Sequence, residues 1–403
     1  MNKRNSMEAD RKHMYKLPWS ATDNQGGWIE VTDRCNITCP GCYRQRMEGD
    51  KPIEKVKEEI LRCKQMTNCD SMVIAGGEPL IYSHIIEVVE YISSLGLKSL
   101  ILTNGVMLTP ELAGQLKNAG LKRIHFHVDA RQDRKNWTGK NEEELNELRQ
   151  YYAEMIYKVK GLQCGFHITV VRETLEQIPA ILKWYRSHMH QVQHISLIAL
   201  SGMPLIKGMS YFVHGTEIPE KDLANSYSDP TEIGITTNDI LEMVQDTYPD
   251  YIPAAYINGG ALTETNKQLF LVNIGTANAF LGVMGAMSME LTQAFSHIFY
   301  GKYYSFAPDP AIGKKVFFLS LFDRQMRKTF FSFLKHVMKR PPGFFDKIYL
   351  QSMIIQQPID FLGAEKNTCD HCVNPMVFGD YLINPCELDE FRVYGDLIVS
   401  LKS

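Results

Sequence analysis

The sequence predicts an α/β fold built on a parallel sheet, either barrel-like or doubly wound, and three observations lead to this prediction. Between about residues 25 and 205, short apolar runs with β-like alternation are separated by segments of helical periodicity. After residue 205 this rhythm ends and longer segments with helical character follow. The cysteines gather near the two ends of the chain. We therefore expect a polar lead at 1–24, a sheet domain at 25–205, a mainly helical region at 206–360 that caps the substrate, and a cysteine-rich end at 361–403.

The elements of the sheet domain follow one another in strand–helix order. Alternating or continuous apolar runs predict six strands, at 27–34, 72–75, 99–103, 123–128, 165–171 and 194–200. Helical spacing of apolar residues predicts five helices, at 53–66, 84–95, 109–119, 142–160 and 175–188. Thr109 is the expected N-cap of the third helix, with Pro110 at its first position and Gly120 at its end. Because parallel strands need crossover connections, functional loops are expected at the carboxyl ends of the strands.

Beyond residue 205 the sequence predicts a helix at 236–247 and a loop at 249–263. The run 268–289 contains no charged residue, which favours a buried helix or a substrate-lining segment over a membrane span. Residues 314–340 combine eight basic residues with a single acid and many phenylalanines. This segment is either a cap helix with a solvated basic face or an amphipathic helix on an anionic membrane surface.

Composition excludes several classes of protein. The 403 residues include 43 basic and 46 acidic residues, and a net charge of −3 excludes the general basic field that nucleic-acid binding uses. The polar start, which has no apolar run after its basic residues, indicates neither a signal peptide nor an anchor, so a cytoplasmic location is expected. In a reducing compartment, nine cysteines point to metal-binding thiolates rather than disulfides.

Cys35, Cys39 and Cys42 place three thiols within eight residues, directly after the first predicted strand. Three soft ligands at this spacing can hold three corners of a [4Fe–4S] cluster and leave the fourth iron open. A four-ligand zinc site would need another cysteine or histidine nearby, and residues 35–43 contain none.

The pattern Cys-x3-Cys-x2-Cys with an aromatic residue after it, followed by Gly76-Gly77-Glu78-Pro79 after the second strand, resembles the radical S-adenosylmethionine (radical SAM) superfamily. The resemblance covers about residues 25–205 and implies a partial (β/α)6 barrel of the TIM type. It implies a [4Fe–4S] cluster whose open iron chelates S-adenosylmethionine, and reductive cleavage to a 5′-deoxyadenosyl radical. Gly76, Gly77, Glu78 and Pro79 would contact the methionine amino group.

The resemblance assigns further cofactor contacts at the strand ends. Tyr43 would meet the adenine, and Asn104, in Thr103-Asn104-Gly105, would lie near the cofactor. Asp129 is placed to accept hydrogen bonds from the ribose, and Arg172 to pair with the methionine carboxylate, although a structural ion pair is the alternative for both. His125 and His127 lie two residues apart on the fourth strand, so at least one of them should face the barrel interior. The charged loop 131–137 could hold a phosphate or carboxylate, or be solvated.

The second metal candidate is Cys369, Cys372 and Cys386. These residues resemble the auxiliary-cluster extensions of several radical SAM families in kind, although not in the spacing of the seven-cysteine type. A second [4Fe–4S] cluster with three cysteine ligands, a zinc site that uses His371, and unligated thiols remain the alternatives. Cys63, Cys69 and Cys164 are expected to be buried free cysteines.

The sequence thus favours a radical SAM enzyme that acts on an unactivated carbon, with no residue yet assigned to the chemistry on the substrate. The uncharged and basic segments favour a hydrophobic or lipid-like substrate, which could carry an anionic head and be met at a membrane surface. The resemblance implies a flavodoxin- or ferredoxin-type electron donor. A peptide-modifying radical SAM enzyme is the alternative, although only some 25 residues precede the first strand, and a zinc-binding interaction module is the non-enzymatic one.

Overall fold

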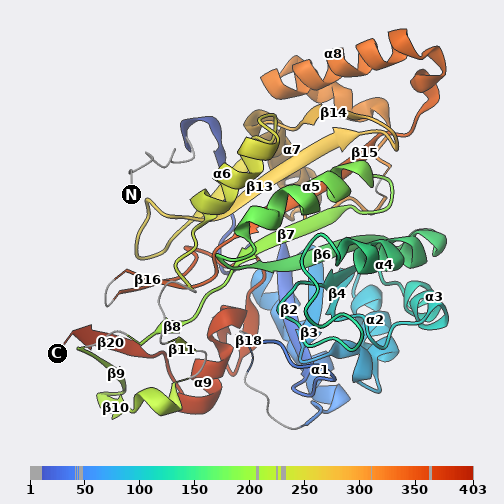
Figure 1. The fold of residues 1–403 in the computed structure, drawn as a ribbon. Helices are drawn as coiled ribbons and strands as arrows, with labels where there is room; N and C mark the ends of the chain where they lie inside the picture. Colours follow the sequence, from blue (N-terminus) through green and yellow to red (C-terminus); the bar gives the residue numbers. More distant parts are fainter. Residues whose placement is uncertain are drawn as a thin grey trace.

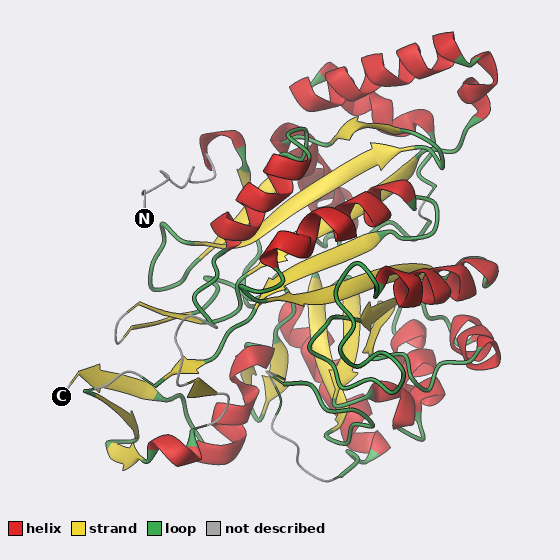
Figure 2. Ribbon diagram, in the orientation of Figure 1, coloured by secondary structure: helices red, strands yellow, loops and turns green. Residues whose placement is uncertain are grey.

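The computed structural model confirms the α/β class and describes residues 11–40, 42, 44, 49–205, 208–223, 226–227, 233–309, 311–362 and 365–402. A large mixed sheet runs through the molecule, with helices packed along it (Figures 1 and 2). Its strand order is β1-β12-β13-β15-β7-β6-β5-β4-β3-β2-β18-β19, with β14 paired to β13. The long strand β13 therefore lies several strands away from the first strands of the domain.

Six parallel strands form the expected partial barrel, and each pairs with the next in sequence. They are β2 (Gly26–Thr32), β3 (Ser71–Gly76), β4 (Lys98–Thr103), β5 (Arg123–His127), β6 (Gln163–Val170) and β7 (His194–Ala199). The crossovers contain α1 (Ile53–Thr67), α2 (Ile85–Ser94), α3 (Pro110–Asn118), α4 (Asn146–Lys158) and α5 (Ile178–Ser187), with the short turns η2 (Pro79–Ile81) and η3 (Leu175–Gln177). Every strand and helix predicted for this domain is present, within a few residues of its expected bounds.

Local sequence explains how several of these helices begin. The Thr109 side chain accepts a hydrogen bond from the Leu112 backbone N–H, and Pro110 occupies the first turn of α3, as expected. The helix α6 (Thr237–Thr247) starts with a capping box, in which Thr236 and Asp239 each accept from the other's backbone N–H. In α4 the helix begins later than predicted, because Glu142 lies in the preceding turn and pairs with the buried Arg149.

The region after residue 205 contains more strand than expected. The uncharged run 268–289 is not one helix: it covers most of β13 (Asn266–Gly275), β14 (Phe280–Val283) and only the start of α7 (Ala286–Tyr300). The run has no charges because β13 lies between β12 (Ala255–Asn258) and β15 (Tyr349–Gln356) and is largely buried. The expected loop 249–263 likewise contains β12. Since β15 pairs parallel to β7, these strands extend the barrel sheet.

Shorter elements complete both edges of the sheet. At one edge β1 (Tyr15–Lys16) pairs with β12, and at the other a hairpin of β18 (Met376–Phe378) and β19 (Tyr381–Ile383) joins β2. The remaining elements are η1 (Arg11–His13), β8 (Met203–Pro204), β9 (Met209–Val213), β10 (Thr216–Ile218), η4 (Glu220–Asp222), β11 (Ser226–Tyr227), β16 (Asp360–Leu362), β17 (Glu365–Asn367), η7 (Pro385–Glu387), α9 (Leu388–Tyr394) and β20 (Val399–Lys402). The C-terminal strand β20 pairs with β9, so the chain's end returns to residues 209–213.

The basic, phenylalanine-rich segment forms two helices and a turn rather than one helix. These are η5 (Lys314–Leu321), α8 (Arg324–Lys339) and η6 (Pro341–Phe345). They pack with β13 and β14 around a small hydrophobic core, formed by Ile274, Leu281, Met284, Phe317, Met326, Phe333 and Ile348. Figure 1 shows α8 at the outer end of the molecule, beyond β14. Within the described residues, no helix combines the length and apolar character that crossing a membrane requires.

Candidate functional site

The cysteine loop follows β2 at the carboxyl edge of the barrel sheet. Cys35 and Cys39 are partly buried and Cys42 is exposed, and the Cys42 backbone N–H donates to the Cys39 carbonyl at 3.0 Å. Burial, and then the neighbouring Cys42 thiolate, Asp129 and Cys35, raise the pKa of Cys39 to about 12. The three sulfurs thus share one environment. A cation or cluster that binds them must displace their protons.

Gly76 and Gly77 let the end of β3 approach the end of β2 closely. A Cβ on Gly77 would lie 2.0 Å from the Arg34 carbonyl oxygen, and one on Gly76 would lie 2.4 Å from that of Thr32. The Gly77 and Glu78 backbone N–H groups donate to the same two carbonyls, each at 2.8 Å. The two glycines therefore position the backbone immediately before Cys35, a contact within the protein that the sequence did not reveal.

Glu78 is fully buried, and its carboxylate is largely occupied by donors of this chain. One oxygen accepts from the Leu80 backbone N–H at 2.9 Å and the Thr103 hydroxyl at 2.6 Å, and the other from the Asn104 backbone N–H at 2.7 Å. Burial raises the pKa of Glu78 despite these bonds. Because two carboxylate oxygens offer about four lone pairs, one acceptor position remains for an ammonium group. Pro79 is buried and begins η2.

Asn104 connects the end of β4 to the cysteine loop. Its side-chain amide nitrogen lies 3.8 Å from the Cys35 sulfur and donates to the Asn36 side chain at 2.6 Å. Its carbonyl accepts from the buried Arg134 guanidinium, which also donates to the His127 carbonyl at 2.8 Å. Asn104 is thus a direct neighbour of a predicted cluster ligand, and N–H bonds to such sulfurs are one means of setting a reduction potential.

Asp129 lies at the end of β5, almost completely buried, and is ionised in the fold. Burial alone would raise its pKa, but the His127 charge and hydrogen bonds from His127 and Thr169 lower it to about 2. The His127 Nε2 atom lies 2.6 Å from one oxygen, and the Arg131 backbone N–H donates to the other at 3.0 Å. Since His127 and Thr169 both bond the first oxygen, the second oxygen keeps one lone pair, which is the position available to a ribose hydroxyl.

The other two predicted contacts differ in their outcome. Arg172 is exposed beyond β6, and its guanidinium donates to the Gly234 carbonyl at 3.3 Å, so it is turned toward the segment before α6. Tyr43 lies outside the described residues. The structure therefore brings together Cys35, Glu78, Asn104 and Asp129 at one edge and leaves the role of Arg172 as a prediction.

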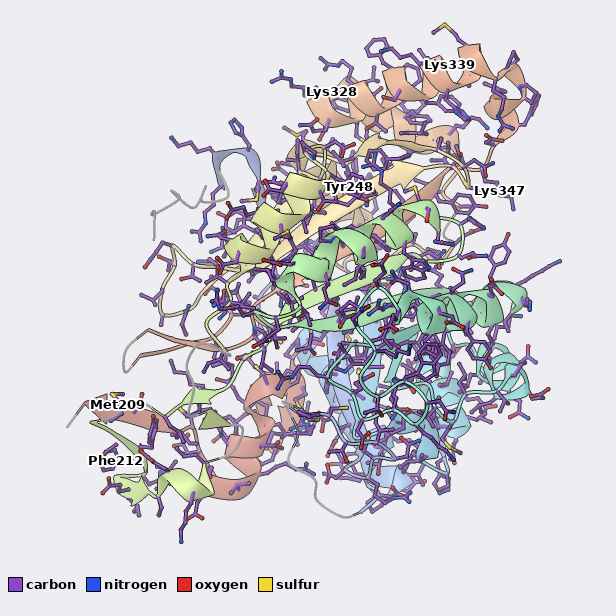
Figure 3. All side chains as sticks on the ribbon, in the orientation of Figure 1. Met209, Phe212, Tyr248, Lys328, Lys339 and Lys347 are labelled. Carbon is purple, nitrogen blue, oxygen red and sulfur yellow. The ribbon has the colours of Figure 1, made fainter. Side chains whose placement is uncertain are left out.

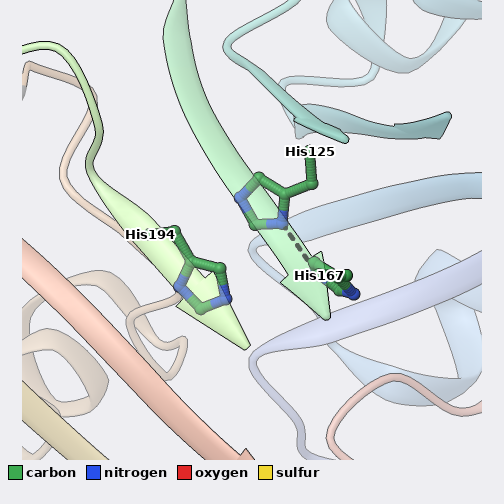
Figure 4. A group of neighbouring side chains, drawn as sticks. All are labelled: His125, His167 and His194. Carbon is green, nitrogen blue, oxygen red and sulfur yellow. Dashed lines mark hydrogen bonds between the residues drawn. The ribbon is translucent and has the colours of Figure 1, made fainter. Parts of the chain in front are cut away.

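Three histidines from neighbouring strands gather inside the sheet, on the same face as His127 but further from its carboxyl edge. His125 of β5, His167 of β6 and His194 of β7 lie together, and the His125 Nδ1 and His167 Nε2 atoms are 3.0 Å apart (Figure 4). The His125 and His194 rings are stacked, with their centroids 4.5 Å apart and an angle of 3° between their planes. In parallel rings the in-plane lone pairs cannot converge on one ion, and Ser352 and Ser196 bond both His194 nitrogens. The cluster is a hydrogen-bonded polar core.

The C-terminal cysteines come together although 17 residues separate the first from the last. Burial raises the pKa of Cys372 and Cys386, and the charges of the neighbouring cysteines and of Glu387 raise both further. The Gln268 side-chain amide lies 3.8 Å from the Cys369 sulfur. His371 is about half exposed, and its nearest described carboxylate is that of Asp370 at 3.9 Å. A three-thiol site is thus assembled from residues on both sides of the β18–β19 hairpin.

Two arginine–carboxylate links join the two cysteine groups through the protein. Arg44, two residues after Cys42, is buried and bonds Glu30 of β2 and, at 2.7 Å, Asp389 of α9. Arg392 of α9 donates to both Asp33 oxygens at 2.7 Å. Asp33 lies two residues before Cys35, so both sides of the cysteine loop are fixed to the helix that follows Cys386.

Sequence reasoning missed Arg44 as part of this site, and it did not predict that His127 and Arg134 hold Asp129 and Asn104. The loop after β5 folds onto the cysteine loop, where the Asp133 backbone N–H donates to the Thr38 carbonyl at 2.9 Å. A basic residue two positions after the last cysteine was the available signal for Arg44. Its partners lie 14 and 345 residues away, which no local pattern shows. Cys63, Cys69 and Cys164 are buried, as expected.

Comparison with known proteins identifies the class that this fold and this site define. Residues 29–185 match the family model described as the Radical SAM superfamily. This match lies over the cysteine motif and the partial barrel, from which the radical SAM superfamily had been predicted. A radical SAM domain implies a [4Fe–4S] cluster and S-adenosylmethionine as cofactors.

Among curated relatives, a GTP 3′,8-cyclase of Alkaliphilus oremlandii is 33% identical over 112 residues, covering 25% of this chain and 34% of the relative. The tungsten-containing aldehyde ferredoxin oxidoreductase cofactor-modifying protein of Pyrococcus furiosus is 23% identical over 168 residues, covering 39% of this chain and 47% of the relative. The chain thus spans about a third to a half of the length of these relatives.

Solved structures with related folds include Streptococcus suis SuiB bound to S-adenosylmethionine, at 16% identity and a TM-score of 0.39, covering 56% of this chain and 47% of SuiB. The anSMEcpe protein with bound AdoMet and a Cp18Cys peptide matches at 14% identity and a TM-score of 0.41, covering 57% of this chain and 60% of that one.

The residues present fit the cofactors that the superfamily implies. Cys35, Cys39 and Cys42 are a soft donor set of three, as a cluster with one open iron requires. Glu78 and Asp129 lie at the ends of β3 and β5, and each carboxylate keeps one acceptor position beside its hydrogen bonds within the protein. An ammonium and a ribose hydroxyl are donors that such positions accept.

Proposed function

We propose that this protein is a radical SAM enzyme in which Cys35, Cys39 and Cys42 bind a [4Fe–4S] cluster. The observation that carries the proposal is the meeting of the cysteine loop, Glu78 and Asn104 at one edge of the parallel sheet. When bound, the reduced cluster and S-adenosylmethionine supply a 5′-deoxyadenosyl radical, which here would act on an unactivated carbon. A flavodoxin- or ferredoxin-type donor would provide the electron.

In this proposal the residues around the cysteine loop bind or orient the cofactors. Gly76, Gly77 and Pro79 hold the turn that presents Glu78 to the methionine ammonium group. Asn104 orients the Cys35 sulfur, and Asp129, ionised and anchored by His127, accepts from the ribose. Tyr43 would meet the adenine, and Arg172 the methionine carboxylate after a turn of its exposed side chain.

The C-terminal thiols are proposed to bind an auxiliary [4Fe–4S] cluster. Cys369, Cys372 and Cys386 are gathered by the fold, which three unrelated free thiols would not require. A zinc site that recruits His371 is the alternative, and it would need the exposed imidazole to turn toward the sulfurs.

The proposed substrate is a hydrophobic or lipid-like molecule with an anionic group. The support is the lobe at 314–347, where exposed apolar and basic side chains lie together on an outlying part of the molecule. A substrate of this kind would be met at the inner face of a membrane. The surface that could make this contact is described in the next subsection.

Iron and sulfide assays on anaerobically reconstituted protein test the cofactor proposal. We expect two [4Fe–4S] clusters per chain and 5′-deoxyadenosine on reduction with S-adenosylmethionine. Replacing Cys35, Cys39 and Cys42 together with Ala should remove one cluster and abolish deoxyadenosine, because no thiolate is left to hold the iron.

The matched control replaces Cys369, Cys372 and Cys386 with Ala, which should remove the other cluster and leave cleavage of S-adenosylmethionine detectable. Cleavage of S-adenosylmethionine by the variant that lacks Cys35, Cys39 and Cys42 would contradict their assignment as cluster ligands. Zinc as the only bound metal would support a zinc-binding interaction module instead. Stimulation of deoxyadenosine formation by lipid fractions supports the substrate class. Stimulation by peptides alone would favour the peptide-modifying alternative.

A further inference from the structure

Residues 314–347 form an outlying lobe, made of η5, α8, η6 and the residues that join them, whose surface combines exposed apolar side chains with basic ones. Exposed large apolar side chains are frequent on this lobe and on α7, where Met287, Phe295, Ile298, Phe299 and Tyr300 are exposed. Of 21 such residues in the described chain, eight lie between positions 318 and 345: Phe318, Leu321, Phe322, Phe331, Leu334, Met338, Phe344 and Phe345. Phe318 and Met338 are each 74% exposed and Phe345 is 82% exposed. Such a density of apolar surface is typical of an interaction site.

Charge is concentrated on the same lobe. The lobe contains nine basic and two acidic residues, which give it a formal charge of +7. Because the whole chain has a net charge of −3, the rest of the chain carries −10. Both acids are engaged within the lobe. Asp323 caps α8 by accepting from the Gln325 and Met326 backbone N–H groups, and Asp346 pairs with His336 and Arg340. The positive field is therefore local, and its target must be anionic.

The helix α8 places most of its exposed basic side chains beside an exposed apolar arc, as an interfacial helix does. At about 100° per residue, Arg324, Lys328, Lys335 and Lys339 share an arc of about 60°. Phe331, Leu334 and Met338 occupy the adjoining arc, also about 60° wide, which they share with Arg327. All eight side chains are exposed, and the Arg327 guanidinium donates to the Ser320 carbonyl at 3.3 Å. Figure 3 shows Lys328 and Lys339 toward the two ends of α8, at the outer edge of the molecule.

The opposite face of α8 packs against the rest of the protein, so the position of its exposed face is fixed. Met326, Thr329 and Phe333 are buried in the core that α8 shares with β13 and β14, and the Phe317 and Phe333 rings stack with their centroids 4.8 Å apart. The Thr329 hydroxyl donates to the Val283 carbonyl of β14 at 3.1 Å. The lobe thus presents a preformed surface, which lowers the ordering cost of binding.

We propose that the exposed face of this lobe docks onto an anionic lipid bilayer, with the apolar arc of α8 inserted between headgroups and the basic arc against phosphates. A helix with apolar residues beside a row of Lys and Arg binds in this way without spanning. A second copy of the chain is a poor occupant, since contact between two such faces would oppose seven positive charges to seven. The inference extends the proposed function by naming where its lipid-like substrate is met.

Co-sedimentation of the iron–sulfur-loaded full chain with vesicles tests this docking without turnover. We expect binding to vesicles of phosphatidylcholine and phosphatidylglycerol in equal parts, and at least about 100-fold weaker binding to phosphatidylcholine alone. Replacing Arg324, Lys328, Lys335 and Lys339 with Gln should weaken binding to the mixed vesicles by at least about 100-fold. The matched control replaces four exposed lysines elsewhere with Gln: Lys117, Lys158, Lys160 and Lys183. Its affinity for the mixed vesicles should be within about threefold of that of the parent protein.

A second pair of variants tests the apolar arc. Replacing Phe331, Leu334 and Met338 with Ser should weaken vesicle binding at least about tenfold, because the inserted surface is lost. Replacing the exposed Tyr151, Tyr157 and Tyr381 with Ser should leave it unchanged. Absence of parent binding to mixed vesicles, or equal loss in the control variants, would overturn the proposal and favour an acidic protein partner.

The two proposals fail in distinguishable ways. Vesicle binding needs neither reductant nor S-adenosylmethionine, and deoxyadenosine formation by the reconstituted protein needs no vesicle. Loss of binding with cleavage retained overturns the docking surface alone. Binding retained by a protein that never cleaves S-adenosylmethionine overturns the radical chemistry alone. Circular dichroism and iron content of each variant confirm that its fold is intact.

Discussion

The three histidines inside the sheet are held neutral by burial. Burial, followed by the neighbouring histidines, keeps the pKa of His125 and His194 well below the ordinary value, and burial lowers that of His167 to about 3. In the unfolded chain all three would accept protons below about pH 6.5. Because the unfolded state then binds more protons than the folded state, stability must fall as the pH decreases below that value.

A shift from about pH 7.5 to about pH 5.5 should therefore lower the free energy of unfolding by about 4 kcal/mol, or about 1.4 kcal/mol for each histidine. Denaturant unfolding at the two pH values, followed by tryptophan fluorescence under anaerobic conditions, measures this loss. His194→Phe should reduce the pH dependence by about a third, whereas His188→Gln, at a partly buried residue outside this cluster, should not change it. If the free energy of unfolding of His194→Phe depended on pH as strongly as that of the parent protein, these imidazoles would be charged in the folded state.

At the scale of elements, the site depends on how closely two strand ends approach. β2 and β3 run parallel, and their carboxyl ends meet where Gly76 and Gly77 face the carbonyls of Thr32 and Arg34. No side chain larger than hydrogen fits between these backbones. The cysteine loop begins at the next residue, so its position is set by this contact.

Gly77→Ala should therefore displace the cysteine loop, since its Cβ would lie 2.0 Å from the Arg34 carbonyl oxygen. We expect lower iron incorporation and a melting temperature reduced by several degrees, as for a change that costs about 1–3 kcal/mol. Gly114→Ala is the matched control, because a Cβ there, in the middle of α3, meets nothing within 4 Å. That change should leave iron content intact and stability equal or slightly higher. Full iron in Gly77→Ala would contradict this account.

At the scale of the whole molecule, the C-terminal segment is fixed by ion pairs to the residues on either side of the cysteine loop. Arg44 lies buried between Glu30 and Asp389, and α9 also holds Asp33 through Arg392. Breaking a buried ion pair by removing one partner leaves the other charge without compensation. The two cysteine groups should accordingly lose stability together.

Arg44→Met should cost about 3–5 kcal/mol, because Glu30 and Asp389 would then be buried without their cation. The less buried Arg392→Met should cost clearly less, since water can solvate Asp33. Chemical unfolding of both variants, together with the absorbance of the clusters, provides the comparison. Equal stability of Arg44→Met and the parent would mean that the two regions are independent.

The barrel domain could be predicted from sequence because its signals are local. Thr109 and Pro110 begin α3 through contacts within one turn, and Cys35, Cys39 and Cys42 are close in space because they are close in sequence. The run 268–289 is predicted as a buried helix or a substrate-lining segment, because an absence of charge indicates burial but not the element that is buried. A strand between two partners and an internal helix share that composition.

By itself the sequence determined the class of fold, the order of the barrel strands and helices, the radical SAM motif and the two groups of cysteines. Each of these depends on residues within about one helical turn, one strand or one loop of each other. Only the tertiary structure decided that the Glu78 carboxylate is nearly saturated by donors of its own chain, that Arg44 joins β2 to α9, and that three histidines gather on one face of the sheet. Those facts depend on strand register and on contacts across up to 345 residues, and such contacts arise from packing of the whole chain, which no local pattern encodes.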